Sequence, residues 1–381
     1  MVRRAAPARR TGILLLAALL AAGWLLVRPA TPVGPLVAAA ECARHYVATG
    51  DHIPAGHEVE EAERYPNQLL SEHLEPVGPW CLYPFAVDEA TSTEYITEGQ
   101  VSGAWNRAAD LITITIGGEN PSIVDLVTDC FDKVKDHDFL GASACAGAVY
   151  ANQGAFDTIK RDLTTILGYY RVLAARRPNL VVAITTYPNP YPSSTKALTS
   201  IPQLCLPLID TIVTCTIRWM QLPPALVLLD RTIGRLNQTI TDAVKPFQLA
   251  ANGQRFVVVD GYTKLRDHCM KMEVEIKTKV EHPEQNGAVH DHNSPKVNFG
   301  CSDPWFVEGD DGTKEPTYLI PATLGVLIQQ SQTTSGMGTH PDEDGQDCLS
   351  DLIFEADTIE PGVTPLKWKL GIAEAAQDPC T

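Results

Sequence analysis

The stretch "DLITITIGG" at residues 110–118 indicates the kind of fold that this chain adopts. It is continuously apolar, rich in β-branched residues and closed by two glycines, which is typical of a buried strand that runs into a loop. Further runs of this type are "HYVATG" at 45–50, "NLVVAITTYPNP" at 179–190 and "RFVVVDGY" at 255–262. Long amphipathic segments with helical spacing lie at 156–178 and 225–244. Strands buried on both faces and separated by helices predict a three-layer α/β/α sandwich around a central parallel sheet.

The carboxyl ends of these strands are where a ligand site is expected, because open parallel sheets bind their ligands there. Three strand ends carry polar or aromatic residues: Gly50-Asp51-His52, Gly117-Gly118-Glu119-Asn120 and Thr186-Tyr187-Pro188. We expect the first two to share a pocket.

Residues 1–40 have the order of a secretory signal. Arginines at positions 3, 4, 9 and 10 precede an apolar run at 13–27, and a small-residue exit ends at Ala40. We therefore expect a secreted protein in which 1–40 is a signal peptide and 41–381 is a single domain. The alternative is an N-terminal anchor that holds the domain at the outer face of a membrane. Beyond this segment we expect no integral membrane domain.

The charge of the chain is strongly acidic. The first 40 residues contain five of the 30 basic residues and none of the 46 acidic ones, so residues 41–381 have a net charge of about −21. Nucleic acids and anionic membranes need a basic surface on their partner, so neither is expected to bind. We expect a monomer that acts on a small molecule such as an ester, a lipid or a carbohydrate.

The ten cysteines all lie after residue 40. An even number in an exported chain indicates disulfides, and the absence of a C-x-x-C pair argues against a zinc ribbon. The sequence does not fix the pairing. The simplest hypothesis joins neighbours in chain order: Cys42–Cys81, Cys130–Cys145, Cys205–Cys215, Cys269–Cys301 and Cys348–Cys380.

Six features in order carry a resemblance to a known family. They are "YVATGDH" (46–52), "DLITITIGGEN" (110–120), the pair Cys130 and Cys145, "RLNQTI" with the following "FVVVD" (235–260), "CSDPW" (301–305) and "GTHPDEDG" (338–345). Together they resemble the SGNH or GDSL-type hydrolases, and more narrowly the secreted, disulfide-rich actinobacterial esterases and lipases. The resemblance implies an SGNH-hydrolase-like domain that acts on ester bonds.

In that family a serine attacks the ester carbonyl and a histidine removes its proton. The resemblance places His52 at the nucleophile position, after Asp51. It places His340 at the position of the catalytic histidine, and Met337 where a partner carboxylate is expected. The serine nucleophile is therefore replaced by histidine.

A glycine amide and an asparagine side chain hold the oxyanion in the family. The resemblance places Glu89 at the glycine position and Glu119 at the asparagine position, with Asn120 one place late. A carboxylate repels the negative charge that such a site must stabilise, and losing one donor typically costs a factor of about 10² to 10³. The site is therefore remodelled.

Several functions fit this set of residues. One is an exported ester hydrolase with a remodelled site; in one version of it His52 is a covalent nucleophile, and His340 or Glu119 carries the proton. Another is a catalytically inactive relative that binds an acyl or carbohydrate ligand in the inherited cleft. A third is a metal-dependent hydrolase, because His52, Glu89, Glu119 and His340 are ligand types for zinc, iron or manganese. Apart from this divalent metal, no cofactor is expected.

Three other segments have plain interpretations. "GASAC" at 141–145 lacks a preceding strand and is expected to close a loop between Cys130 and Cys145. His290 and His292 are expected in a polar loop. The segment 271–285, in which charged and apolar residues alternate, is expected to be a solvated excursion over the surface.

Overall fold

The computed structural model describes residues 42–56, 59–127, 129–135, 138–191, 220–249, 255–268, 271–282, 288–300, 317–321, 327–335 and 341–356, and for 271–335 it describes the backbone alone. The elements of the first half are β1 (Arg44–Gly50), α2 (His52–Ala55), η1 (Glu61–Glu63), α3 (Tyr65–Gln68), η2 (Leu69–Leu74), η3 (Glu75–Val77), β2 (Trp80–Pro84), α4 (Ser92–Thr97), α5 (Gln100–Asn106), β3 (Leu111–Thr115), α6 (Pro121–Val127), α7 (Asp129–Lys135), α8 (Phe139–Ala151), α9 (Gln153–Arg176) and β4 (Val181–Thr185). Those of the second half are α12 (Leu222–Gln248), β5 (Phe256–Val259), α13 (Gly261–Lys264), η5 (Leu265–His268), β6 (Lys271–His282), β7 (Ala288–Gly300), β8 (Thr317–Pro321), β9 (Leu327–Ser335) and α14 (Glu343–Phe354).

Five parallel strands form the central sheet, in the order β2-β1-β3-β4-β5. Tyr46 of β1 pairs with Leu111 of β3, and Leu111 pairs in turn with Val181 of β4. Every residue of β3 and β4 is buried, as their continuously apolar sequences predict. The predicted α/β/α sandwich with a parallel sheet is confirmed.

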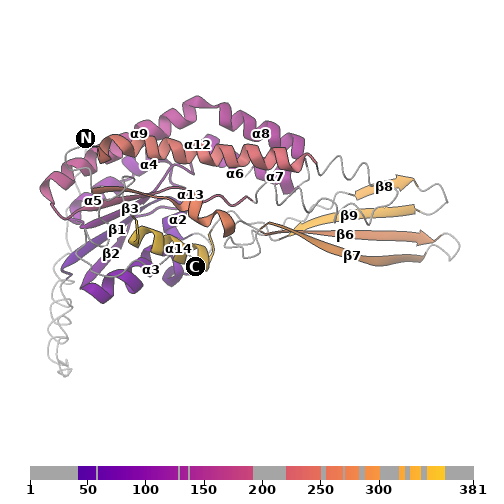
Figure 1. The fold of residues 1–381 in the computed structure, drawn as a ribbon, viewed down its shortest axis with the longest axis horizontal. Coiled ribbons are helices and arrows are strands. Elements are labelled where there is room, and N and C mark those ends of the chain that lie inside the picture. Colours follow the sequence, from indigo (N-terminus) through magenta and orange to yellow (C-terminus); the bar gives the residue numbers. More distant parts are fainter. Residues whose placement is uncertain are drawn as a thin grey trace, which may run out of the picture. The chain divides into compact units, whose positions relative to one another are not determined.

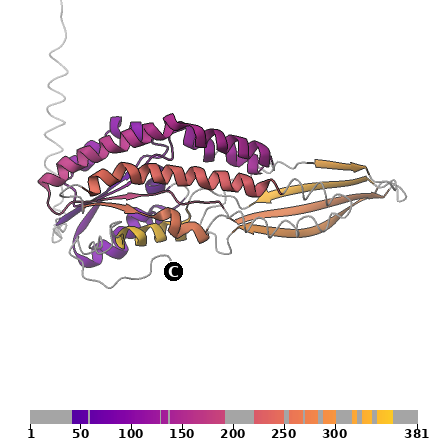
Figure 2. The ribbon, with the colours of Figure 1, turned by 45° about the horizontal axis from the view of Figure 1, so that its top comes forward.

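Helices cover both faces of this sheet (Figure 1). The long helices α9 and α12 lie over one face, and α3 and α14 lie over the other; the same layers are seen after a 45° turn (Figure 2). The amphipathic segment predicted at 156–178 corresponds to α9, whose apolar stripe is fully buried and consists of Ile159, Leu163, Ile166, Leu167 and Tyr170. The apolar stripes of the helices therefore close the core on both sides.

Buried tyrosines bond to the threonines inside the sheet. The Tyr46 hydroxyl lies 3.0 Å from Thr113 Oγ1, and the Tyr65 hydroxyl lies 3.4 Å from both Thr113 Oγ1 and Thr115 Oγ1. Because buried hydroxyls need partners, these bonds fix the helix that carries Tyr65 against the centre of the sheet. The bond to Thr115 lies at the carboxyl end of β3, because Thr115 is the last residue of that strand.

Strand β2 was not expected from the sequence. Its residues, "WCLYP", are mostly half-buried, and it pairs with β1 at the edge of the sheet. Proline lacks the amide hydrogen that a central strand needs, so Pro84 at the end of β2 suits an edge position. A short, half-exposed strand gives neither the buried run nor the strict alternation that sequence patterns detect.

A second sheet lies in the segment after residue 270. Its strands are antiparallel, in the order β7-β6-β9-β8. Residues 271–282 of the segment expected to pass over the surface form strand β6, and the exposure of its side chains stays a prediction. The expectation of a polar loop for His290 and His292 was wrong, because both belong to strand β7. Alternation of charged and apolar residues has the period of a strand, which is the pattern that a two-sided antiparallel sheet requires.

Two of the hypothesised disulfides are present. Cys42 bonds to Cys81 and thereby ties the start of β1 to β2, and Cys130 bonds to Cys145. "GASAC" lies within helix α8, so the second bridge joins two helices, α7 and α8, rather than closing a loop. Cys348 is also disulfide-bonded. The pairings Cys205–Cys215, Cys269–Cys301 and Cys348–Cys380 involve positions outside the described residues and stay predictions.

No helix of the described ranges is both long and apolar enough to cross a membrane. The signal peptide or anchor at 1–40 lies outside the described residues, so the domain boundary at residue 40 stays a prediction.

Candidate active site

The backbone before His52 is shaped by contacts that only glycine permits. Gly50, the last residue of β1, has a φ of +135°, and a Cβ there would lie 2.0 Å from the carbonyl oxygen of Thr115. The next amide, that of Asp51, donates to the same oxygen at 2.9 Å. The chain therefore leaves the sheet by a turn packed tightly against the end of β3.

Gln100 of α5 holds this turn from the other side. Its Oε1 accepts a hydrogen bond from the Gly50 N–H at 2.8 Å, and its Nε2 donates to the Gly50 carbonyl oxygen at 3.0 Å. One buried side-chain amide thus satisfies both backbone groups of the last strand residue. Asp51 and His52 leave the sheet from a backbone that is bonded on two sides.

Asp51 is fully buried at the start of helix α2. One carboxylate oxygen accepts from the Ile53 N–H at 3.3 Å, and the other accepts from the Tyr187 hydroxyl. Burial raises the pKa of Asp51 to about 6, although the charge of His52 and the bond from Tyr187 oppose the shift. Asp51 is therefore a carboxylate at neutral pH and becomes neutral in mildly acidic solution.

His52 and Glu119 form an ion pair between the ends of β1 and β3. The pair joins His52 Nδ1 to a Glu119 carboxylate oxygen, and the nearer oxygen of Asp51 lies 3.9 Å from the same nitrogen. The two side chains are 14% and 18% exposed. Burial lowers the pKa of His52, but the charges of Asp51, Glu119 and Asp88 outweigh that effect and raise the pKa above its ordinary value. The first two predicted strand ends therefore meet.

Asn120 does not present its amide as the family pattern would require. The residue is buried, its Oδ1 accepts from the Ser92 N–H at 3.1 Å, and its Nδ2 donates to Ser92 Oγ at 3.0 Å. Its carbonyl oxygen also accepts from the Ile123 N–H at 2.7 Å. The residue thus links the loop after β3 to the starts of α4 and α6, which is a structural role.

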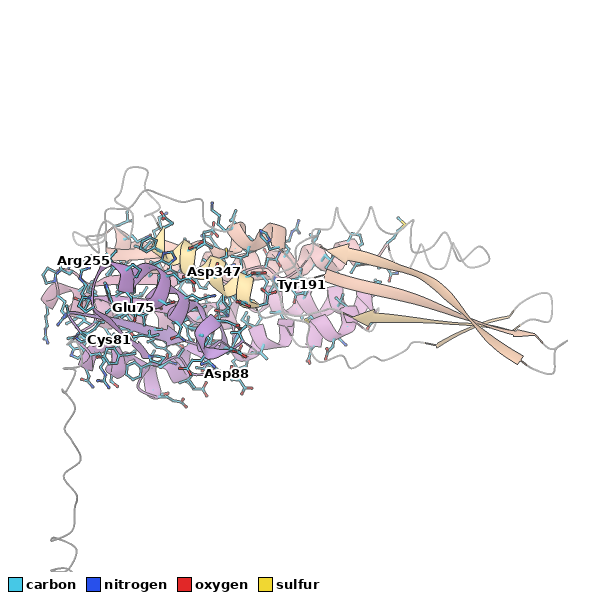
Figure 3. The ribbon with its side chains drawn as sticks, turned by 90° about the horizontal axis from the view of Figure 1, so that it is seen from below. Glu75, Cys81, Asp88, Tyr191, Arg255 and Asp347 are labelled. Atoms are coloured by element: carbon cyan, nitrogen blue, oxygen red, sulfur yellow. A yellow bond between two sulfur atoms is a disulfide. The ribbon has the colours of Figure 1, made fainter. Side chains whose placement is uncertain are left out.

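Glu89 is exposed, and its φ of 60° lies in the left-handed region that favours glycine. Its amide donates to its neighbour, at Asp88 Oδ1, over 3.1 Å. In this loop it is the charge of Asp88, an exposed residue labelled in Figure 3, that raises the pKa of His52. Sequence reasoning missed Asp88 because two acidic neighbours give no signal that separates them.

Tyr187 was named only as part of a third strand end, yet it touches the site directly. Its hydroxyl donates to Asp51 and accepts from the Gly118 N–H at 2.7 Å. A Cβ on Gly118 would lie 2.6 Å from the Tyr187 ring, so the ring needs a glycine there. Its position beyond a buried strand was the available signal, since neighbouring parallel strands end at one edge of the sheet.

His340 and Met337 lie outside the described residues. The helix that follows them, α14, contacts the site through Gln346, whose Nε2 donates to the Ile53 carbonyl oxygen at 3.4 Å and whose Oε1 accepts from the Tyr65 N–H at 3.0 Å. Within the described ranges, no group of three or more His, Cys, Asp or Glu side chains is arranged to hold a metal ion. His340 lies outside those ranges, so the predicted set of His52, Glu89, Glu119 and His340 stays a prediction.

A pocket of about 580 Å³ opens between the end of β2 and helix α5. It shares Gln100 with the turn that precedes His52. Its lining combines apolar and polar side chains with two glycines: Phe85, Val87, Glu98, Gly99, Gln100, Ser102, Gly103, Asn106 and Arg107.

No family model matches the chain, and no curated protein matches it. Lipases, a phospholipase and a lipase/acylhydrolase are among the solved structures to which it is similar. They include phospholipase A1 from Streptomyces albidoflavus NA297, with 15% identity, a TM-score of 0.42 and coverage of 80% of this chain and 95% of that chain. The lipase Lip_vut3 from a goat rumen metagenome has 18% identity, a TM-score of 0.37 and coverage of 58% and 83%. A possible lipase from Chitinophaga pinensis DSM 2588 has 14% identity, a TM-score of 0.31 and coverage of 81% and 95%. Such distant likenesses concern the architecture and carry no argument about the site.

Proposed function

We propose that this protein is an exported hydrolase of carboxylic esters in which the His52–Glu119 pair activates water directly. The observation that carries the proposal is that ion pair, at the carboxyl end of the sheet where ligands bind. A carboxylate bonded to Nδ1 of an imidazole fixes the orientation of the ring and assigns proton transfer to Nε2. The replaced serine is then not needed, because water is the nucleophile.

The chemical step follows from these roles. His52 Nε2 takes a proton from a water molecule while the oxygen of that water attacks the ester carbonyl. Glu119 stabilises the imidazolium that forms. When the tetrahedral intermediate collapses, the imidazolium returns the proton to the leaving alkoxide, giving a carboxylic acid and an alcohol. No covalent acyl-enzyme forms, so no burst of the alcohol product is expected. Because the base must be neutral, hydrolysis should increase as the pH rises through the elevated pKa of His52.

A second candidate is a non-catalytic protein that binds an acyl or carbohydrate ligand. The observation that favours it is the Asn120 amide, which bonds to Ser92 and not toward an oxyanion. Glu119, at the expected asparagine position, is negatively charged next to His52. A site with these features suits a bound ligand better than it suits a developing oxyanion.

Hydrolysis of p-nitrophenyl acetate and p-nitrophenyl palmitate by the purified protein separates the two candidates. His52→Ala and Glu119→Gln should lower kcat/KM by about 10² or more. His73→Ala is the matched control, because His73 forms a second histidine–carboxylate pair with Asp351, at 2.9 Å, on a different pair of elements. Equal hydrolysis by wild type and His52→Ala would eliminate the proposed site. No hydrolysis by the wild type would support the second candidate, a non-catalytic binding protein. Loss of activity in EDTA with recovery in Zn²⁺ would instead favour the metal-dependent alternative.

A further inference from the structure

The Tyr187 hydroxyl joins two segments that come from different strands. It donates to the Asp51 carboxylate at the end of β1 and accepts from the Gly118 N–H after β3. Asp51 immediately precedes His52, and Gly118 immediately precedes Glu119. One buried hydroxyl therefore bridges the chain neighbours of both members of the ion pair.

Tyr187 is itself held from two sides. The side-chain amide of Asn237 in α12 accepts from the Tyr187 N–H and donates to the Tyr187 carbonyl oxygen, each at 2.8 Å. The ring packs against Gly118 so closely that a methyl group there would lie 2.6 Å from it. The side chain is 6% exposed, so its hydroxyl has a fixed position relative to the sheet.

We propose that Tyr187 is a positioning residue of this site, whose hydroxyl sets the separation of His52 and Glu119 by bridging Asp51 and the Gly118 amide. The inference rests on the proposed function, because it assigns to Tyr187 the orientation of the pair that would activate water. Burial and the charge of Asp51 hold the pKa of the phenol well above its ordinary value. The hydroxyl therefore stays protonated and keeps the same donor and acceptor roles at every pH at which the enzyme is measured.

Tyr187→Phe removes only the bridging oxygen and is the direct test in the full chain. With the pair misplaced, kcat on p-nitrophenyl acetate should fall by about 10- to 100-fold while KM stays within about twofold. Tyr191→Phe is the matched control, since Tyr191 is also buried in the segment after β4 but is bonded through its backbone amide to Asn189. A change in KM with an unchanged kcat would overturn the assignment.

A second readout does not depend on activity. In protein with ¹⁵N-labelled histidine, the imidazole ¹⁵N shift of His52, assigned by its loss in His52→Gln, reports the hydrogen bond to Glu119. We expect this shift to move toward that of an unpaired histidine in Tyr187→Phe and to stay constant in Tyr191→Phe. If the wild type hydrolyses no ester but the shift moves, the proposed function fails and the positioning role stands.

Gly118→Ala approaches the same bridge from the other side, since the added methyl group must displace the Tyr187 ring. It should change the His52 shift in the same direction, and it serves as the test if Tyr187→Phe does not fold. An unchanged His52 shift in whichever of these variants folds overturns the proposal.

Discussion

Asp51 is a carboxylate in a position from which water is excluded, and this has a measurable effect on stability. Its pKa is 3.8 in an ordinary environment and about 6 in the folded protein. An acid whose pKa is higher in the folded state adds stability below its unfolded pKa and loses it as the pH rises through its folded pKa. For Asp51 that loss falls between pH 3.8 and about pH 6.

Asp51→Asn removes this titration and so tests the burial of the charge. The free energy of unfolding of the wild type, relative to that of Asp51→Asn, should fall by about 2 kcal/mol as the pH rises from 4 to 7. Urea unfolding of both proteins at the two pH values measures this difference. Asp347, whose pKa burial also raises to about 6, titrates in both proteins and cancels. Parallel stability profiles would show that Asp51 is exposed to water in the folded protein.

His52 should titrate above the ordinary pKa of histidine, and the cause can be assigned by substitution. Glu119→Gln removes its ion-pair partner and should lower the pKa of His52, while Asp88→Asn should lower it by less. Glu89→Gln should leave the pKa unchanged, because the charges that raise the pKa of His52 are those of Asp51, Glu119 and Asp88. Nuclear magnetic resonance titration of His52 measures all four proteins. An equal effect of the Glu89 and Glu119 substitutions would restore the sequence-based expectation that both glutamates line the pocket.

At the scale of elements, the strand end that carries the site depends on a glycine. Gly50→Ala places a methyl group 2.0 Å from the Thr115 carbonyl oxygen, in a backbone conformation with φ of +135°. We expect a loss of more than about 3 kcal/mol in the free energy of unfolding, because β1 and β3 must separate. Gly147→Ala in α8 is the control, since nothing lies within 4 Å of an added methyl group there and the helix should gain about 0.5 to 1 kcal/mol. Thermal unfolding compares the three proteins, and equal melting temperatures would contradict the tight turn.

An element could be predicted from the sequence when its own residues specify its structure, and not when its pairing with another element does. Strands β3 and β4 are buried at every position, so their composition alone specifies them. The edge strand β2 is specified mainly by its pairing with β1, and its own sequence carries little signal. The segment of β6 alternates charged and apolar residues, which is the period of a strand, although no strand was expected there. A strand with alternating charged residues differs from a loop in its periodicity, so periodicity is the property that distinguishes the two in a sequence.

The site was predictable in its position but only partly in its members. Strand ends identified His52 and Glu119, because parallel strands bring their carboxyl ends together. Asp88 was missed, since its position depends on the path of a loop. Tyr187 was identified only as part of a strand end, and its contact with the site depends on a hydrogen bond across the sheet. The bonding of Asn120 to Ser92 likewise arises between segments 28 residues apart, which no local pattern records.

At the scale of the whole molecule, the disulfides are the feature that a direct measurement can settle. Peptide mapping without reduction should recover Cys42–Cys81 and Cys130–Cys145, and it decides whether Cys348 pairs with Cys380 as hypothesised. Replacing both Cys130 and Cys145 by alanine should lower the free energy of unfolding by about 3 kcal/mol, as expected for a bridge between residues separated by 15 positions. Free thiols at these four cysteines, or unchanged stability of the double variant, would contradict the pairing.

The amide clamp of Gln100 on Gly50 has a consequence for how such a protein can evolve. The bonds that shape this turn run through the backbone of Gly50, the backbone and carboxylate of Asp51, and the side chain of Gln100. The shape of this turn therefore does not depend on the side chain at position 52. A lineage can exchange that group by single substitutions without rebuilding the scaffold, so its chemistry can diverge faster than its shape. Sequence searches that depend on the residue at this position fail to find such proteins, whereas comparison of backbone structures can still find them.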